Sequence, residues 1–276
     1  MEITAKMVKD LRDSTGAGMM DCKKALSEAN GDIKEAEKIL KKMGLAAVAK
    51  RADRATENGK VTIKSDKNGA VIVVVSCETD FVARNEEFAS LGEKLADIAL
   101  ENKFTEPNDT LKKEVDALIS KIKENMTIKS ITYIPLKENE RVEGYLHMGG
   151  VLGVAVKYSA DDKSAFDNAD VKEFMHSVAL HVAAYKPLYL SDKTVDENYK
   201  KEQLEIFQAQ VAALDKPEQV KEGITMGKLK KLYDEVCLLS QPYLKDTSKS
   251  VGTVLSEVVK STGKKFEIAD YWYVEA

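Results

Sequence analysis

The first 44 residues show a hydrophobic pattern that predicts three short helices. Apolar residues recur there at helical spacings in three segments, which span residues 4–16, 19–29 and 32–44. Thr4 and Asp32 are residue types that cap helix N-termini, and Gly16 and Gly44 are placed to end the first and third helices. Helices this short bury only a small core. Residues 1–54 are therefore predicted to form a compact helical module with a linker at its end.

The pattern changes to that of strands after residue 58. Val61–Ile63 leads into Asp66–Gly69, whose Asn-Gly pair favours a tight hairpin turn. Val71–Val75 follows as an apolar strand that we expect to be buried on both faces. Two helices and a strand are predicted next, at residues 87–101, 111–125 and 128–136. Together these elements make up a predicted first core subdomain, residues 55–138.

A second hairpin followed by a helix repeats this plan. Its predicted elements are strands at 142–147 and 152–157 and a helix at 171–184. A helix near 253–260 and a strand at 265–274 are predicted to end the chain. Residues 139–194 and 238–276 are therefore expected to form a second, similar core subdomain, and the fold class is predicted to be α+β with antiparallel sheets.

The segment between these two pieces, residues 195–237, has a different pattern. Leu204, Phe207, Val211 and Leu214 are spaced by three, four and three residues, as in the seam of a coiled coil. Pro217 follows a short turn and is placed to start a returning helix. Two helices joined by so short a loop pack antiparallel. We predict a coiled-coil hairpin inserted into the second subdomain.

Composition and charge exclude several classes of protein. Hydrophobic residues make up 43% of the chain and charged residues 32%, as in ordinary folded proteins, and the net charge of −4 argues against nucleic-acid binding by overall charge. The chain has neither an apolar run long enough for a membrane helix nor a signal-peptide pattern at its start. Its three cysteines, Cys22, Cys77 and Cys237, are far apart. A cytoplasmic protein without disulfides, membrane contact or direct nucleic-acid binding is expected.

A search for catalytic chemistry finds no phosphate-binding loop, dinucleotide fingerprint or hydrolase motif. His176 and His181 are five residues apart, about 140° around a helix, so they do not converge on a metal. His181 is expected to be a hydrogen-bonded core residue, and the cysteines are expected to be small apolar core residues. We therefore predict no enzyme, no cofactor and no metal site.

Two segments have more than one interpretation. In Cys77–Asn85, a phenylalanine beside an aspartate follows the buried strand. Phe81 is either a lid over the core or an exposed wedge that enters a pocket of a partner. In Thr15–Leu26, the tandem pair Met19 and Met20 either belongs to an ordinary helix turn or forms a methionine-rich patch for a partner.

These two segments carry a resemblance to the bacterial elongation factor Ts family. Thr15–Leu26, continuing to Asp32, is similar to the N-terminal signature of the family, and Cys77–Val82 is similar to its Thr-Asp-Phe-Val motif. Further matches occur in family order along the chain: Glu124-Asn125, Tyr145-Leu146-His147, His181–Ala184 with Pro187, and Gln241-Pro242-Tyr243. The resemblance implies a helical module like ubiquitin-associated (UBA) domains, two core subdomains and an inserted coiled-coil hairpin.

The same resemblance implies a non-enzymatic guanine-nucleotide exchange factor that acts on elongation factor Tu in translation. Asp80 and Phe81, flanked by Thr79 and Val82, would enter the GTPase domain of the partner beside its magnesium and phosphate site. Further partner contacts are implied for these residues: Met19, Met20, Lys23, Arg51, Met126, His147, Tyr243 and Leu244.

The chain departs from the family pattern at three places. The family often has lysine at the position of Arg51 and an apolar residue at that of Lys245. It also often has a C-terminal helix, for which the chain after Tyr271 is too short, so one partner contact is expected to be missing. The hairpin at 195–237 either forms a homodimer or satisfies its seam internally. The rival function is a scaffold that joins partners without nucleotide exchange.

Overall fold

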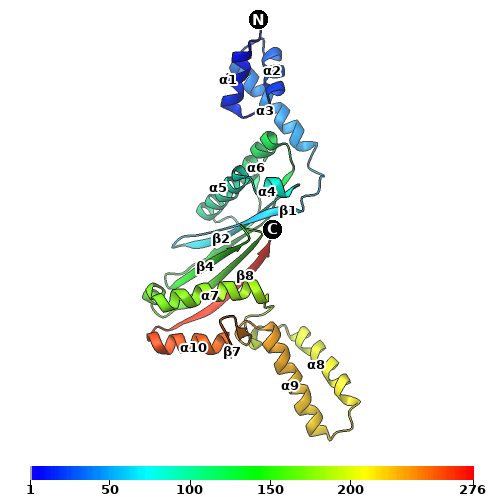
Figure 1. Cartoon of the computed structure of the whole chain (residues 1–276), viewed down its shortest axis with the longest axis vertical. Coiled ribbons are helices and arrows are strands. Elements are labelled where there is room, and N and C mark those ends of the chain that lie inside the picture. Colours follow the sequence, from blue (N-terminus) through cyan, green and yellow to red (C-terminus); the bar gives the residue numbers. More distant parts are fainter. Residues whose placement is uncertain (1) are drawn as a thin grey trace. The chain divides into compact units, whose positions relative to one another are not determined.

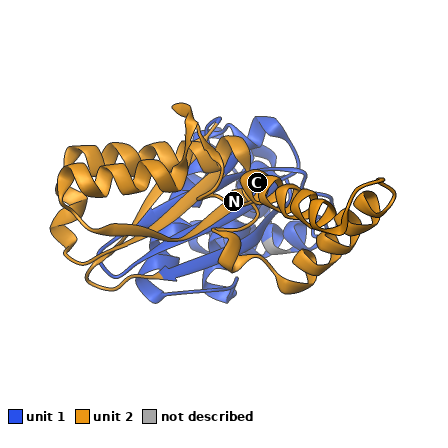
Figure 2. Ribbon diagram, turned by 90° about the horizontal axis from the view of Figure 1, so that it is seen from below, with its two compact units in different colours: residues 1–134, 148–152, 275–276 blue, residues 135–147, 153–274 orange. Residues whose placement is uncertain are grey.

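The computed structural model describes residues 2–276, which fold into helices and antiparallel sheets (Figure 1). The predicted α+β class is confirmed. The chain forms two compact units, coloured separately in Figure 2. Unit 1 contains the chain up to Ile134 with Met148–Leu152 and Glu275–Ala276, and unit 2 contains Pro135–His147 and Gly153–Val274. The four-part division expected from the sequence is finer than this one and stays a prediction.

Unit 1 begins with three helices, α1 (Ala5–Thr15), α2 (Met19–Glu28) and α3 (Ile33–Ala49). The predicted caps are confirmed, because Thr4 accepts a hydrogen bond from the Met7 N–H and Asp32 accepts one from the Glu35 N–H. Gly16 ends α1 with a φ of 69°, a conformation that favours glycine. The small core of this helical region consists of Val8, Leu11, Cys22, Ala25, Leu26 and Ala36.

The rest of unit 1 is a three-stranded sheet in the order β1-β2-β3 with helices packed on it. The strands are β1 (Asn58–Ser65), β2 (Gly69–Cys77) and β3 (Met126–Pro135), and the helices are α4 (Asp80–Ala83), α5 (Glu86–Asn102) and α6 (Asp109–Ile122). All residues of β2 are buried, as predicted. The hairpin between β1 and β2 is also confirmed, with Ser65 opposite Ala70.

The turn of this hairpin forms differently from the prediction. Neither Asn68 nor Gly69 adopts the positive φ that an Asn-Gly turn uses. Instead, the Asp66 carboxylate accepts hydrogen bonds from the backbone N–H groups of both residues. The side chain of Asp66 therefore closes the turn.

Gly44 does not end the third helix, so that prediction is wrong. It lies inside α3, where a Cβ atom would approach the Oγ atom of Ser120 in α6 to 2.6 Å. Gly44 thus permits close packing of α3 on α6, and the helix continues to Ala49 into the segment expected to be a linker.

Unit 2 contains the sheet β4-β5-β8 and a small sheet of β6 and β7. Its strands are β4 (Glu140–His147), β5 (Leu152–Ala160), β6 (Pro242–Tyr243), β7 (Asp246–Ser250) and β8 (Phe266–Glu275). Its helices outside the hairpin are η1 (Lys163–Asp167), α7 (Ala169–Tyr185), η2 (Asp192–Thr194) and α10 (Val251–Thr262). The core contains buried side chains of β5, α7 and β8, among them Tyr158, Phe174 and Phe266.

Two helices, α8 (Glu197–Ala212) and α9 (Glu218–Val236), pack against each other between η2 and β6. Val211 of the expected seam is buried, but Leu214 lies beyond the end of α8 and is exposed. The helix pair is present as expected, and its coiled-coil geometry stays a prediction. Among the described residues, no helix is long and apolar enough to span a membrane.

Candidate functional site

The site is built around the short connection between β2 and α5 in unit 1. β2 ends at Cys77, and Thr79 has an extended backbone before the single turn of α4. The Thr79 hydroxyl accepts a hydrogen bond from the Val82 N–H at 3.3 Å, which caps the helix. Asp80, in the first turn, forms an ion pair with Arg84 at 3.1 Å. The sequence therefore begins a helix at Asp80, one residue before Phe81.

Phe81 points away from the core. Its side chain is 82% exposed, whereas Val82 and Ala83 are buried in the core cluster of unit 1. The lid interpretation is therefore wrong, because the core lies under Val82 rather than under Phe81. Single exposed apolar residues are common on protein surfaces, so the significance of Phe81 depends on how firmly its turn is held.

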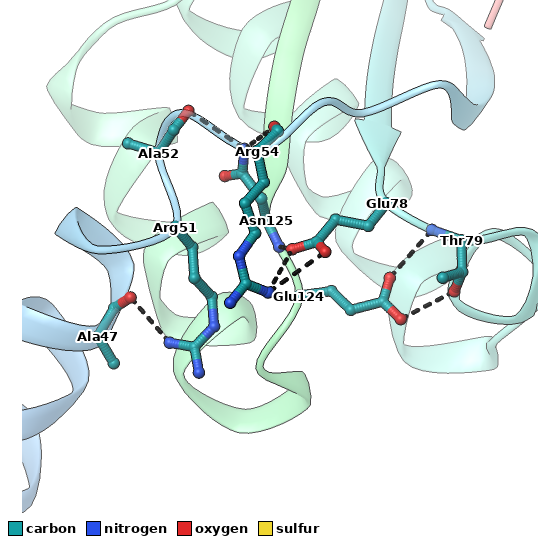
Figure 3. A network of polar contacts seen from close by, with 8 residues as sticks. All are labelled: Ala47, Arg51, Ala52, Arg54, Glu78, Thr79, Glu124 and Asn125. Carbon is teal, nitrogen blue, oxygen red and sulfur yellow. Dashed lines mark hydrogen bonds and ion pairs between the residues drawn. The ribbon is translucent and has the colours of Figure 1, made fainter.

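The turn is held by the carboxylate of Glu124, which lies between α6 and β3. One oxygen of Glu124, Oε2, accepts a hydrogen bond from the Thr79 N–H at 3.1 Å, and Oε1 accepts one from the Thr79 hydroxyl at 2.8 Å (Figure 3). Lys123, with a φ of 67°, ends α6 in the left-handed conformation and is followed directly by Glu124. A single carboxylate thus binds two groups of the residue that caps α4.

A second carboxylate, that of Glu78, extends this network in the opposite direction. The Asn125 N–H donates to Glu78 at 2.6 Å, and the Arg54 guanidinium donates to the same carboxylate at 3.3 Å. The Asn125 side chain donates in turn to the carbonyl oxygens of Ala52, at 3.3 Å, and Arg54, at 2.7 Å (Figure 3). Three segments far apart in the sequence, 52–54, 78–79 and 124–125, are joined in this way.

Cys77 lies beside the network and is buried. Its thiol donates a hydrogen bond to the Thr79 carbonyl at 3.2 Å. Burial, together with the negative charge of Glu124, raises the pKa of Cys77 to about 11. The expectation that all three cysteines are small core residues is confirmed, since Cys22 and Cys237 are buried as well.

The helical region of unit 1 carries four more of the expected contact residues. Met19, Met20 and Lys23 are exposed on α2. Arg51 follows α3 and is half-buried, and its guanidinium donates to the Ala47 carbonyl at 2.8 Å. Its Nε atom is buried without a hydrogen-bond partner. Arg51 directly precedes the segment that the Asn125 side chain holds.

Met126 lies elsewhere than expected. It is the first residue of β3 rather than part of a turn, and its side chain is 4% exposed in the same core cluster as Cys77 and Val82. Its expected place in a turn is therefore wrong, and its role as a partner contact stays a prediction. The side chain belongs to the same core cluster as Val82.

The expected contact residues of unit 2 also include both exposed and buried side chains. His147 is exposed at the end of β4, where its Nδ1 atom is 2.9 Å from the Tyr145 hydroxyl. Tyr243 is 6% exposed, and its ring stacks on Phe174 in the core. Its role as a partner contact stays a prediction. Leu244 is half-buried, and its backbone N–H donates to Nδ1 of His181.

His181 is a hydrogen-bonded core residue, as expected. It is fully buried, and its Nε2 atom is 2.9 Å from Oε1 of Gln241. Because Nδ1 accepts the Leu244 N–H, the neutral ring carries its proton on Nε2 and donates it to Gln241. Burial lowers the pKa of His181, although the hydrogen bond with Gln241 opposes this effect.

The sequence alone did not predict that Glu78, Arg54 and Glu124 form the hydrogen-bond network that holds the turn. The sequence does contain a signal: Glu78-Thr79 follows β2, Glu124-Asn125 precedes β3, and these two strands are neighbours. Each pair combines a carboxylate with a polar residue next to the end of one of these two strands. In the described part of the chain, no group of three or more His, Cys, Asp or Glu residues could hold a metal ion.

Comparison with known proteins identifies the family. A sequence model of the family described as elongation factor TS matches residues 78–275. The chain is 44% identical to elongation factor Ts of Treponema denticola over 269 residues, covering 98% of this chain and 96% of that protein. It is 41% identical to that of Treponema pallidum strain Nichols over 274 residues, with coverages of 95% and 94%. It is 38% identical to that of Clostridium botulinum strain Alaska E43 over 278 residues, with coverages of 96% and 90%. The chain therefore belongs to the elongation factor Ts family.

Proposed function

We propose that this member of a translation elongation factor family is a guanine-nucleotide exchange factor. It binds elongation factor Tu in its GDP form, inserts the Asp80-Phe81 turn near the magnesium and phosphate site, and so promotes GDP release and GTP loading. The observation that carries the proposal is the exposed Phe81 on a turn whose cap is fixed by Glu124.

The mechanism uses binding energy and makes or breaks no covalent bond. Burying the ring of Phe81 in the partner contributes about 1.5–3 kcal/mol, and that energy offsets the cost of moving side chains at the magnesium site. A protein that binds the nucleotide-free partner more tightly than the GDP form weakens GDP binding by the same factor. Because hydrogen bonds from Glu124 hold the turn before binding, we expect little of this energy to be spent on ordering it.

Other residues at least partly exposed extend the proposed contact. Met19, Met20 and Lys23 on α2, with Arg51 after α3, would bind the same GTPase domain. Methionine side chains adapt to a surface of irregular shape, and Lys23 and Arg51 supply polar contacts at its edge. In unit 2, His147 and the loop of Leu244 would form a second contact area.

A release assay tests the proposal. Elongation factor Tu is loaded with a fluorescent GDP analogue, and release is followed with and without this protein. We expect acceleration by the wild-type protein and by Leu188→Ala, a control that truncates an exposed apolar residue outside the proposed contact. A folded protein that binds elongation factor Tu without accelerating release would support the scaffold function instead.

Homodimer formation through the hairpin is a separate part of the proposal. The feature that favours it is a set of exposed apolar side chains on or beside α8 and α9: Ile206, Leu214, Val220 and Met226. Analytical ultracentrifugation of the wild-type protein and of a Val220→Ser/Met226→Ser variant distinguishes the two cases. A dimer that the substitutions dissociate supports the interface, and a wild-type monomer at high concentration refutes it.

A further inference from the structure

We propose that Glu124 is the positioning residue of this site: it fixes the turn that presents Phe81, and it acts through Thr79 rather than on the partner. The proposal rests on the exchange function in one respect, since it predicts an effect on GDP release. The structural part, that Glu124 holds the turn, applies to the free protein.

Both oxygens of the Glu124 carboxylate are engaged by one residue. They accept the backbone N–H and the hydroxyl hydrogen of Thr79, at 3.1 Å and 2.8 Å. The Thr79 hydroxyl has one proton, and donating it to Glu124 turns an oxygen lone pair toward the Val82 N–H, at 3.3 Å. Glu124 therefore fixes both the backbone of Thr79 and the rotamer with which Thr79 caps α4.

The conformation of α4 depends on the hydrogen bonds at its ends, because the helix is so short. α4 has four residues, and a single helical turn does not form stably by itself. Its first backbone hydrogen bonds are Ala83 N–H to the Thr79 carbonyl and Arg84 N–H to the Asp80 carbonyl, both at 3.1 Å. A shift of Thr79 would therefore move the whole turn, including Phe81.

Hydrogen bonds hold the backbone on both sides of Glu124. The preceding residue, Lys123, closes α6 by donating its N–H to the Ile119 carbonyl at 2.8 Å. The following residue, Asn125, is buried and makes the hydrogen bonds to Glu78, Ala52 and Arg54 described above. Figure 3 shows the Glu124 side chain extending from this backbone segment to Thr79. The carboxylate thus links the turn to a part of unit 1 that has its own hydrogen-bond network.

Three substitutions of Glu124 separate positioning from a general structural role. Glu124→Ala removes both acceptors. Glu124→Gln keeps two hydrogen bonds, because its amide oxygen accepts the Thr79 N–H and its NH₂ group donates to the Thr79 hydroxyl, whose second lone pair remains for Val82. Glu124→Asp keeps the charge but is one methylene shorter, so it serves as the disrupting variant if Glu124→Ala does not fold.

Hydrogen exchange in the free protein is the first measurement. In Glu124→Ala and Glu124→Asp, we expect the hydrogen-bonded amides of Thr79, Val82 and Ala83 to exchange about tenfold faster or more, since the hydrogen bonds between Glu124 and Thr79 are lost. Amides of β2 should keep their rates, and Glu124→Gln should behave as the wild type. Unchanged exchange of these three amides in Glu124→Ala would overturn the proposal. This result is obtained whether or not the protein accelerates nucleotide release.

GDP release from elongation factor Tu is the second measurement. We expect Glu124→Ala to reduce the acceleration about tenfold or more and Glu124→Gln to restore it. If Glu124 acts through the position of Phe81, the double variant Phe81→Ala/Glu124→Ala is no slower than Phe81→Ala alone. Losses that multiply in the double variant would contradict positioning. A wild-type protein without any acceleration would refute the exchange function, while the exchange of the amides still decides whether Glu124 holds the turn.

Discussion

The side chain of Phe81 is 82% exposed, whereas that of Val82, the next residue in the same helical turn, is 7% exposed. Successive residues of a helix point about 100° apart, so one short turn can attach itself to the core through one side chain and present the other to a partner. This arrangement predicts that stability and nucleotide exchange depend on different residues of the same turn.

Paired substitutions in α4 test this separation. Phe81→Ala should change the free energy of unfolding by less than about 0.5 kcal/mol, as is usual for exposed positions. Val82→Ala should lower it by about 2 kcal/mol, because it leaves a cavity in the core of unit 1. Urea unfolding of the two variants measures both values. A large loss of stability in Phe81→Ala would restore the lid interpretation.

Gly44 provides a second test, on the packing of α3 against α6. Gly44→Ala should cost about 1–3 kcal/mol, because the new Cβ would approach Ser120 Oγ to 2.6 Å. Gly44→Ala/Ser120→Ala removes the closest contact but leaves the Ser120 Cβ at 3.0 Å, so it should recover only part of this loss. Gly223→Ala is the matched control: its position in α9 is open, so it should gain up to about 1 kcal/mol. An equal effect of both single substitutions on the melting temperature would refute the packing argument.

The buried His181 predicts a pH dependence of stability. Its pKa is lowered in the folded state, so the unfolded chain binds a proton more readily. The stabilisation from the neutral ring is therefore complete above the unfolded pKa of about 6.5, and it is lost as the pH falls below that value toward the folded pKa. His181→Gln should flatten this part of the pH profile of urea unfolding. A profile that is equally steep in His181→Gln would contradict the assignment.

The cysteines predict resistance to alkylation. Burial raises the pKa values of Cys77 and Cys237 to about 11, so at pH 8 both are protonated and inaccessible. Iodoacetamide should modify neither residue in the folded protein and both in urea, as measured by mass spectrometry. Rapid modification of Cys77 in the folded protein would show that the turn beside it opens.

Local features of the fold could be predicted from the sequence because they depend on neighbouring residues. The helix caps Thr4 and Asp32 and the buried strand β2 are examples. Gly44 was assigned incorrectly because its role depends on Ser120, 76 positions later in the chain. A glycine at a helix end and one at a helix crossing look alike in a sequence.

The same distinction applies to the site. The motif around Phe81 was recognised from the sequence, but the motif could not reveal that Met126 and Tyr243 are buried, because burial depends on the packing of distant elements. The hydrogen bonds between Glu124 and Thr79 were not predicted because these residues are 45 positions apart in the sequence. Their contact exists only once the neighbouring strands β2 and β3 have formed.

The central claim is that the exposed ring of Phe81 drives nucleotide release, and the rate of GDP release from elongation factor Tu tests it most directly. At saturating concentrations of this protein, the account predicts that Phe81→Ala loses most of the acceleration given by the wild type while keeping its melting temperature. Removing about 1.5–3 kcal/mol of buried apolar contact corresponds to a loss of about 10- to 150-fold. A stable Phe81→Ala protein that accelerates release as fast as the wild type would contradict the account.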